Sequence, residues 1–155
     1  MEQRVLELLR AHNFKITCAE SCTGGLISGR LVNASGISEF YEAGVVTYAN
    51  AAKERFLKVP HEMLSKYGAV SPQVAQAMAE GALDFAGADV SIAVTGIAGP
   101  GGGSEEKPVG LVYIACCVRG RVALERHIFS GNRTQVREST VEAALSLVVK
   151  CLEKM

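Results

Sequence analysis

The apolar run at residues 89–95 is the feature that most constrains the fold of this chain. It reads DVSIAVT and leads directly into a glycine-rich segment at 96–108. An apolar run without alternation is typical of a strand that is covered on both faces of its sheet. Such a sheet needs helices on each side, so this run favours an α/β protein.

Helix-like and strand-like segments alternate around this run. Apolar residues at helical spacing predict helices at 5–12, 24–32, 50–57, 61–67, 71–83 and 136–152. Apolar and β-branched runs predict strands at 15–19, 43–48, 89–95, 109–118 and 122–129, the last two forming an antiparallel hairpin. We therefore expect a three-layer α/β/α sandwich with a mixed, mostly parallel sheet, in one domain spanning residues 1–155.

Composition excludes several functional classes. The chain has 16 Lys plus Arg and 16 Asp plus Glu, so no long-range attraction to nucleic acid is expected. No apolar run approaches the roughly 20 residues of a membrane span. Five cysteines without metal-ligand spacing are interpreted as free thiols in a reducing cytoplasm. We expect no metal, no cofactor, no nucleic-acid or membrane partner, and a homo-oligomer, which the apolar content allows.

Three polar segments follow predicted strands, where ligands bind in open α/β sheets. The first, AESCTGG at 19–25, places Ser21 near the start of a helix. Backbone N–H groups around Gly24 and Gly25 could hold a phosphate or the oxyanion of an acyl-transfer intermediate. Alternatively, Ser21 or Thr23 caps the helix that follows, which is the commonest use of these residue types.

The second segment, TYANAAK at 47–53, supplies candidates for a base. None of the three histidines lies at a predicted strand carboxyl end, so a Ser-His-Asp triad is not expected. A lysine with a lowered pKa can replace histidine, and a tyrosine can relay the proton. Lys53 and Tyr48 are therefore candidates, the alternative being a solvated lysine and a half-buried aromatic.

The third segment, TGIAGPGGGS at 95–104, holds five glycines within eight residues. Such a loop permits close backbone approach to a phosphate, although flexible surface loops have the same composition. Further along, Arg133 and Arg137 at the start of the last helix suit phosphate or carboxylate binding, unless they are simply solvated.

Together these segments resemble one family, the CinA C-terminal domain family, whose characterised members are nicotinamide-nucleotide amidases. The resemblance covers nearly the whole chain, in order. The chain also resembles the stand-alone form, without the additional N-terminal domain of many relatives. The matching stretches are AESCTGG at 19–25, GVVTY at 44–48 with Lys53, GAVS at 68–71, the segment 95–110 and FSGNR at 129–133.

The resemblance implies hydrolysis of the carboxamide of nicotinamide mononucleotide to nicotinic acid mononucleotide and ammonia. By similarity Ser21 is the nucleophile, Lys53 its base with help from Tyr48, and Thr95 orients the substrate or the nucleophile. Whether Lys53 or Tyr48 accepts the proton stays open. The alternative function is a non-catalytic nucleotide-binding or interaction module of the competence/damage-inducible type, which binds a nucleotide without forming product.

The same resemblance and the three polar segments suggest how the substrate is held. Arg133 is expected to contact the phosphate, with Arg137 as the second choice. Ser38 is the candidate for a serine that the family has in the turn before the second strand. Asn132 stands where the family often has Asp, so no charge role is expected there. The expected substrate-binding residues are Thr23, Gly24, Gly25, Ser38, Gly96, Gly99, Arg133 and Arg137.

Overall fold

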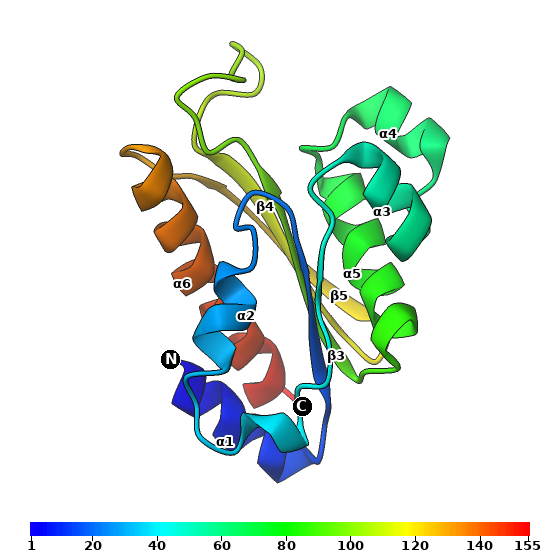
Figure 1. Cartoon of the computed structure of the whole chain (residues 1–155), viewed down its shortest axis with the longest axis vertical. Helices are drawn as coiled ribbons and strands as arrows, with labels where there is room; N and C mark the ends of the chain where they lie inside the picture. The colour runs from blue at the N-terminus through cyan, green and yellow to red at the C-terminus, as the bar shows by residue number, and fades with distance from the viewer.

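The computed structural model describes residues 1–155 as a five-stranded sheet with helices on both faces (Figure 1). The strand order is β2-β1-β3-β4-β5. β1 pairs in parallel with β2 and β3, whereas β3–β4 and β4–β5 are antiparallel, which confirms the mixed sandwich and the hairpin. The strands are β1 (Ile16–Glu20), β2 (Val45–Val46), β3 (Val90–Gly96), β4 (Leu111–Val118) and β5 (Arg121–Ile128).

Two groups of helices cover the sheet, one on each face (Figure 1). On one face lie α1 (Glu2–His12), α2 (Leu26–Leu31) and α6 (Arg133–Glu153). On the other lie α3 (Asn50–Leu57), α4 (His61–Tyr67) and α5 (Pro72–Ala86). A short 3₁₀ helix, η1 (Ile37–Glu39), was not predicted.

β3 separates two apolar cores, as its continuous apolar sequence predicts. Ile92 and Val94 pack with residues of α1, α2 and α6. Ala93 faces α5 together with Ala19 and Ala115 from the neighbouring strands. Because these side chains are small, α5 can lie close to the sheet and its own buried face is equally rich in alanine.

Two elements are shorter than the sequence predicts. β2 contains only Val45 and Val46, although one more ladder bond follows, from Thr47 N–H to the Glu20 carbonyl. The chain then turns into α3, so Tyr48 lies after the strand rather than in it. α2 begins at Leu26, because Gly24 and Gly25 adopt φ of 58° and 105°, outside the helical region.

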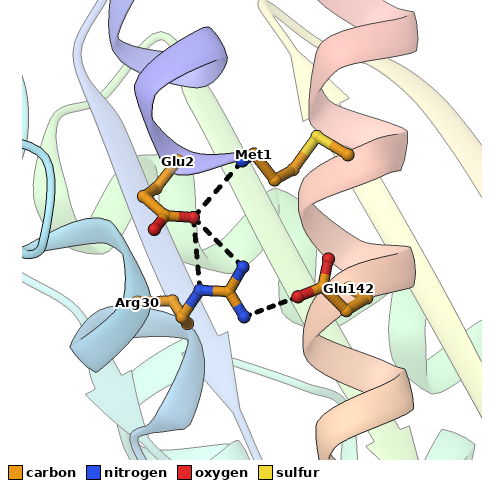
Figure 2. A network of polar contacts seen from close by, with 4 residues as sticks. All are labelled: Met1, Glu2, Arg30 and Glu142. Carbon is orange, nitrogen blue, oxygen red and sulfur yellow. Dashed lines mark hydrogen bonds and ion pairs between the residues drawn. The ribbon is translucent and has the colours of Figure 1, made fainter.

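An ion-pair network ties together the three helices of one face (Figure 2). Arg30 of α2 donates to Glu2 of α1 at 3.1 Å and to Glu142 of α6 at 2.6 Å. The amino group of Met1 lies 3.5 Å from Glu2. These side chains are partly exposed, so each pair contributes at most about 1 kcal/mol to stability.

The structure also bears on two expectations from composition. All five cysteines are free thiols, with only Cys151 partly exposed. None of the helices combines the length and the apolar character that crossing a membrane requires.

Candidate active site

A cleft of about 330 Å³ opens at the carboxyl ends of β1 and β3. This is where open α/β sheets bind ligands. A larger hollow of about 760 Å³ lies between α2 and α6, but it contains none of the residues predicted for catalysis. The residues predicted from the sequence that line the cleft are Ser21, Tyr48, Lys53, Thr95, Gly96, Gly99 and Arg133.

The sheet register explains why distant hydroxyl residues meet in this cleft. Ala19 of β1 pairs with Ala93 of β3, so two residues later Ser21 lies beside Thr95. Both are buried and both belong to the face covered by α5. The Thr95 hydroxyl donates to the Ala69 carbonyl at 2.8 Å, which leaves its oxygen free to accept a hydrogen bond from a ligand.

Lys53 brings an amine to the hydroxyl of Ser21. Its Nζ donates to Ser21 Oγ at 3.2 Å and to the Thr47 carbonyl at 2.8 Å. Lys53 is only 1% exposed, because it shares the buried side of α3 with Leu57, one turn later. The solvated lysine considered from the sequence is therefore not found.

Burial also changes the protonation of this amine. Desolvation lowers the pKa of Lys53 below its usual value, and the nearby Cys22 thiol opposes this only in part. No carboxylate hydrogen-bonds to the amine, whose partners are Ser21 Oγ and a main-chain carbonyl. Burial therefore makes the neutral form of Lys53, which is the form that can accept a proton, easier to reach than in a solvated lysine.

Glu20 occupies the helix start that the sequence assigned to a ligand. Its buried carboxylate accepts hydrogen bonds from the backbone N–H groups of Gly25, Ile27 and Ser28 at 3.0, 3.1 and 2.8 Å. The Thr23 and Ser28 hydroxyls donate to it as well. The carboxylate thus satisfies the first N–H groups of α2, a role in which neither Ser21 nor Thr23 is used.

This arrangement corrects the anion cradle expected at Gly24 and Gly25. Gly25 N–H is held by Glu20, and Gly24 N–H donates to the Ser21 carbonyl at 3.1 Å. Thr23, Gly24 and Gly25 do not line the cleft. By contrast, no backbone carbonyl accepts the N–H groups of Cys22 and Thr23, which directly follow the serine.

Arg137 fixes the turn that carries Ser21. Its guanidinium donates to the carbonyls of Cys22 and Thr23 at 3.0 and 3.1 Å. Arg137 does not line the cleft, so the structure gives it a different place from the phosphate contact considered as second choice. Two carbonyls held by one planar cation have little freedom to reorient, and the serine turn is held in shape from the side of α6.

Arg133 and Tyr48 stand at the rim of the cleft. Arg133 donates to the Gly99 carbonyl at 2.7 Å and to the Tyr48 hydroxyl at 3.1 Å. Tyr48 is 64% exposed, more than the half-buried aromatic that the sequence suggested, and its hydroxyl forms no hydrogen bond with Ser21 or Lys53. Asn132 caps α6 in a capping box with Gln135, so this residue has a structural role.

The glycine-rich loop between β3 and β4 forms one wall of the cleft and projects beyond the sheet (Figure 1). Close contacts require glycine at two positions, the last residue of β3 and one residue of the loop. A Cβ on Gly96 would lie 2.6 Å from Val112 Cγ2, and one on Gly99 would lie 2.5 Å from Val109 Cγ1. Lys107 fastens the loop to α4 by donating to the Tyr67 carbonyl at 2.6 Å.

Ser38 is not brought to the cleft. It lies in η1, exposed, and the carbonyl of Phe40 just after it bonds to Ile16 N–H at the start of β1. The chain between parallel strands must return to the amino end of the sheet, and that end is opposite to Ser21. The substrate contact expected for Ser38 is therefore corrected.

No histidine lines the cleft, and no group of three His, Cys, Asp or Glu side chains could hold a metal ion. Two residues of the site, Glu20 and Thr47, were not predicted from the sequence. Glu20 lies within the matched motif, and its position just before a serine-glycine turn was the available signal. For Thr47 the only signal in the sequence was its place at a strand end.

Comparisons with known proteins agree with this architecture. The family model of the CinA C-terminal domain matches residues 1–152. The CinA-like protein of Dictyoglomus thermophilum is 48% identical over 148 residues, which are 96% of this chain and 36% of that protein. The CinA-like protein of Syntrophobacter fumaroxidans is 47% identical over 152 residues, which are 98% of this chain and 36% of that protein. The chain thus spans about a third of the length of these curated relatives.

Solved structures extend the comparison to the fold. A competence-damaged protein (CinA) superfamily protein from Klebsiella pneumoniae is 37% identical, with a TM-score of 0.95 over 99% of this chain and 96% of that one. A competence/damage inducible protein from Agrobacterium tumefaciens is 44% identical, with a TM-score of 0.89 over 97% of this chain and 96% of that one. The chain belongs to the CinA C-terminal domain family.

Proposed function

We propose that this chain hydrolyses the carboxamide of nicotinamide mononucleotide, giving nicotinic acid mononucleotide and ammonia. The observation that carries the proposal is the 3.2 Å contact between Lys53 Nζ and Ser21 Oγ inside a ligand-sized cleft. A serine hydroxyl is a weak nucleophile until a base takes its proton. A buried amine whose pKa is lowered supplies that base without histidine.

Acylation begins when Lys53 takes the proton of the Ser21 hydroxyl. Ser21 Oγ forms a bond to the carboxamide carbon, whose oxygen becomes an oxyanion. The N–H groups of Cys22 and Thr23, which no backbone carbonyl accepts, are the nearest donors along the chain for that oxyanion. Arg137 holds their turn in place.

The intermediate then collapses with loss of ammonia. The Lys53 ammonium gives its proton to the carboxamide nitrogen as the carbon–nitrogen bond breaks, and an ester remains on Ser21. Water attacks this ester while Lys53 takes one of its protons. That proton returns to Ser21 Oγ as the carbon–oxygen bond breaks, which releases the carboxylic acid.

Two rim groups suit the rest of the substrate. Arg133 is exposed and reaches across the cleft to Gly99 and Tyr48, so a phosphate could replace these weaker acceptors. The free acceptor capacity of Thr95 Oγ1, beside Ser21, suits the carboxamide NH₂ group. Because the Tyr48 hydroxyl contacts Arg133 and not Ser21, the geometry favours Lys53 over Tyr48 as the proton acceptor.

The test is ammonia and nicotinic acid mononucleotide formation by the purified chain, with a chelator present to exclude metal contamination. Ser21→Ala is expected to reduce turnover by about a thousandfold or more with an unchanged far-UV spectrum. Ser65→Ala, on the exposed surface of α4, is the matched control and keeps full activity. Unchanged turnover in Ser21→Ala would remove this serine from the mechanism. Nucleotide binding without product would favour the interaction module instead.

A further inference from the structure

The hydroxyl of Thr47 is the one buried side-chain oxygen or nitrogen in the protein that lacks a hydrogen-bond partner. Thr47 is fully buried, and its backbone N–H and carbonyl are both bonded, to Glu20 and Lys53. Burying a hydroxyl without a partner destabilises a folded protein, so native structures rarely keep one without a functional reason.

The sheet register places this hydroxyl on the catalytic face. Val46 of β2 pairs with Glu20, and the next ladder bond joins Thr47 N–H to the Glu20 carbonyl. Thr47 therefore lies beside Ser21, and neighbours across a sheet point to the same face. With Thr95 on the other side of Ser21, three hydroxyl residues form a row across β2, β1 and β3 beneath Lys53.

The two hydrogen bonds of the Lys53 amine leave one of its N–H groups without a partner. A neutral amine has two N–H groups and a lone pair, and an ammonium has three N–H groups. The Thr47 carbonyl accepts one N–H of Lys53. A second proton lies between Lys53 Nζ and Ser21 Oγ and is the one transferred between these two atoms. The remaining N–H is weakly polar on the neutral amine, but it carries part of the positive charge once Lys53 is protonated.

The surroundings offer few other acceptors for it. The titratable groups in the cleft are Cys22 from the turn after β1, Tyr48 before α3 and Arg133 from α6. Burial raises the pKa of the Cys22 thiol to about 11, so it stays neutral, and Tyr48 is engaged by Arg133. The buried face of α5, which packs on α3, is apolar, its members being Val74, Ala75, Met78, Ala79 and Ala82.

We propose that Thr47 is a positioning residue whose hydroxyl accepts the remaining Lys53 N–H when the amine is protonated. The two groups are not hydrogen-bonded in the resting structure, so this contact requires one of the two side chains to rotate. The hydroxyl thus stays unpaired in the resting protein and stabilises the ammonium that forms after proton transfer. This role rests on Lys53 being the base of the proposed amidase.

The test compares three variants in the protein without substrate. Thr47→Val keeps the shape and removes the hydroxyl, and Thr47→Ser keeps the hydroxyl. Thr17→Val is the matched control, since Thr17 is also buried in this sheet but its hydroxyl donates to the Ala43 carbonyl at 2.8 Å. The titration of Lys53 is followed by the ¹³C shift of its ε-carbon, assigned by comparison with Lys53→Met.

Thr47→Val is expected to move the Lys53 midpoint to lower pH by about one pH unit, the effect of one charge-assisted hydrogen bond. Thr47→Ser and Thr17→Val are expected to leave it in place. Urea unfolding above the Lys53 midpoint, where the amine is neutral, is expected to show a loss of stability in Thr17→Val and none in Thr47→Val. With substrate, Thr47→Val lowers kcat about tenfold at unchanged KM.

An unchanged Lys53 midpoint in Thr47→Val overturns the inference, as does a loss of stability equal to that of Thr17→Val, which would mean that the hydroxyl binds a structural water. The titration needs no turnover. If the wild-type protein releases no ammonia, the proposed function fails while the Thr47–Lys53 coupling is still decided by the midpoints.

Discussion

Glu20 and Ser21 are consecutive residues whose side chains leave the end of β1 on opposite faces of the sheet. The Glu20 carboxylate holds the start of α2, whereas the Ser21 hydroxyl meets Lys53 from α3. One strand end therefore anchors a helix on one face and presents the Ser21 hydroxyl to the cleft on the other. The shape of the serine turn depends on both sides, since Thr23 and Gly25 of that turn bond to Glu20.

Replacing Glu20 by Gln is expected to destabilise the fold by about 2–4 kcal/mol. The amide of Gln has an NH₂ group that cannot accept the backbone N–H groups and hydroxyls that now surround the carboxylate. The displaced turn also moves Ser21, so ammonia release falls in the same variant. The free energy of unfolding is measured by urea titration.

Glu142→Gln is the matched control for this substitution. Glu142 also accepts a short hydrogen bond, from Arg30 at 2.6 Å, but its side chain is 52% exposed (Figure 2). Exposed pairs contribute little, so a loss below about 1 kcal/mol is expected. Similar losses in both variants would contradict the structural role assigned to the buried carboxylate.

Replacing Lys53 by Met is expected to reduce turnover by about a thousandfold. The same substitution is expected to stabilise the fold by about 1–2 kcal/mol at pH 7. The folded pKa of Lys53 is lowered by burial, whereas the unfolded chain keeps the usual value of 10.5. Between these two values the unfolded state binds more protons, so stability rises with pH in that window. Below the lowered pKa the cost of burying the amine is present in full.

The measurement is urea unfolding of both proteins from pH 6 to pH 11. Burial raises the pKa of Cys22, which is buried, to about 11 and that of Tyr41, which is half-buried, to about 12, so both titrate near this range. The difference between variant and wild type isolates the Lys53 contribution, because these groups occur in both. We expect the gain from Lys53→Met to shrink as the pH approaches 10.5. A gain that stays constant over this range would show that the amine is not desolvated.

Arg133→Met is expected to raise KM for nicotinamide mononucleotide about 10- to 100-fold with a smaller change in kcat. Its guanidinium is exposed at the rim and touches no reacting group, so its loss weakens binding rather than chemistry. Arg137→Met is expected to lower kcat instead, because the Ser21 turn loses its clamp.

The phosphate contact is checked with the nucleoside that lacks the phosphate. Wild type and Arg133→Met should act on it with equal kcat/KM, since the missing group is the one that we propose Arg133 binds. Arg126→Met, on the exposed side of β5, controls for the loss of a positive charge and should leave both substrates unaffected. A loss in Arg133→Met that is equal for nucleotide and nucleoside would assign this arginine to a different contact.

Much of the cleft follows from the sequence because strand ends meet in space. Ser21 follows the end of β1 and Thr95 lies near the end of β3, and parallel strands bring such ends to the same edge of the sheet. Lys53 was a candidate because it lies on the first turn of the helix after a strand end, and the structure buries it on the same side of α3 as Leu57. These inferences need only strand direction and helical spacing.

The remaining features depend on choices that spacing does not decide. The N–H groups at the start of α2 could bind a ligand or a carboxylate of the chain, and only the fold shows that Glu20 reaches them. The place of Ser38 depends on which end of the sheet the connection reaches, information that motif similarity does not carry. The orphan hydroxyl of Thr47 is visible only after all of its neighbours are known.

Gly81→Ala tests how closely α3 must lie against α5 for Lys53 to reach Ser21. Alanine in a helix is ordinarily more stable than glycine by about 0.5–1 kcal/mol. Here a Cβ would overlap the carbonyl oxygen of Leu57 at the end of α3, so the helix must move away. We expect a net loss of about 1–3 kcal/mol and a fall in turnover, because Lys53 lies one turn from Leu57. Gly29→Ala in α2 is the control: this glycine has open space around it, so the variant should gain stability and keep turnover. An equal gain in Gly81→Ala would show that α3 has room to move without losing the Lys53–Ser21 contact.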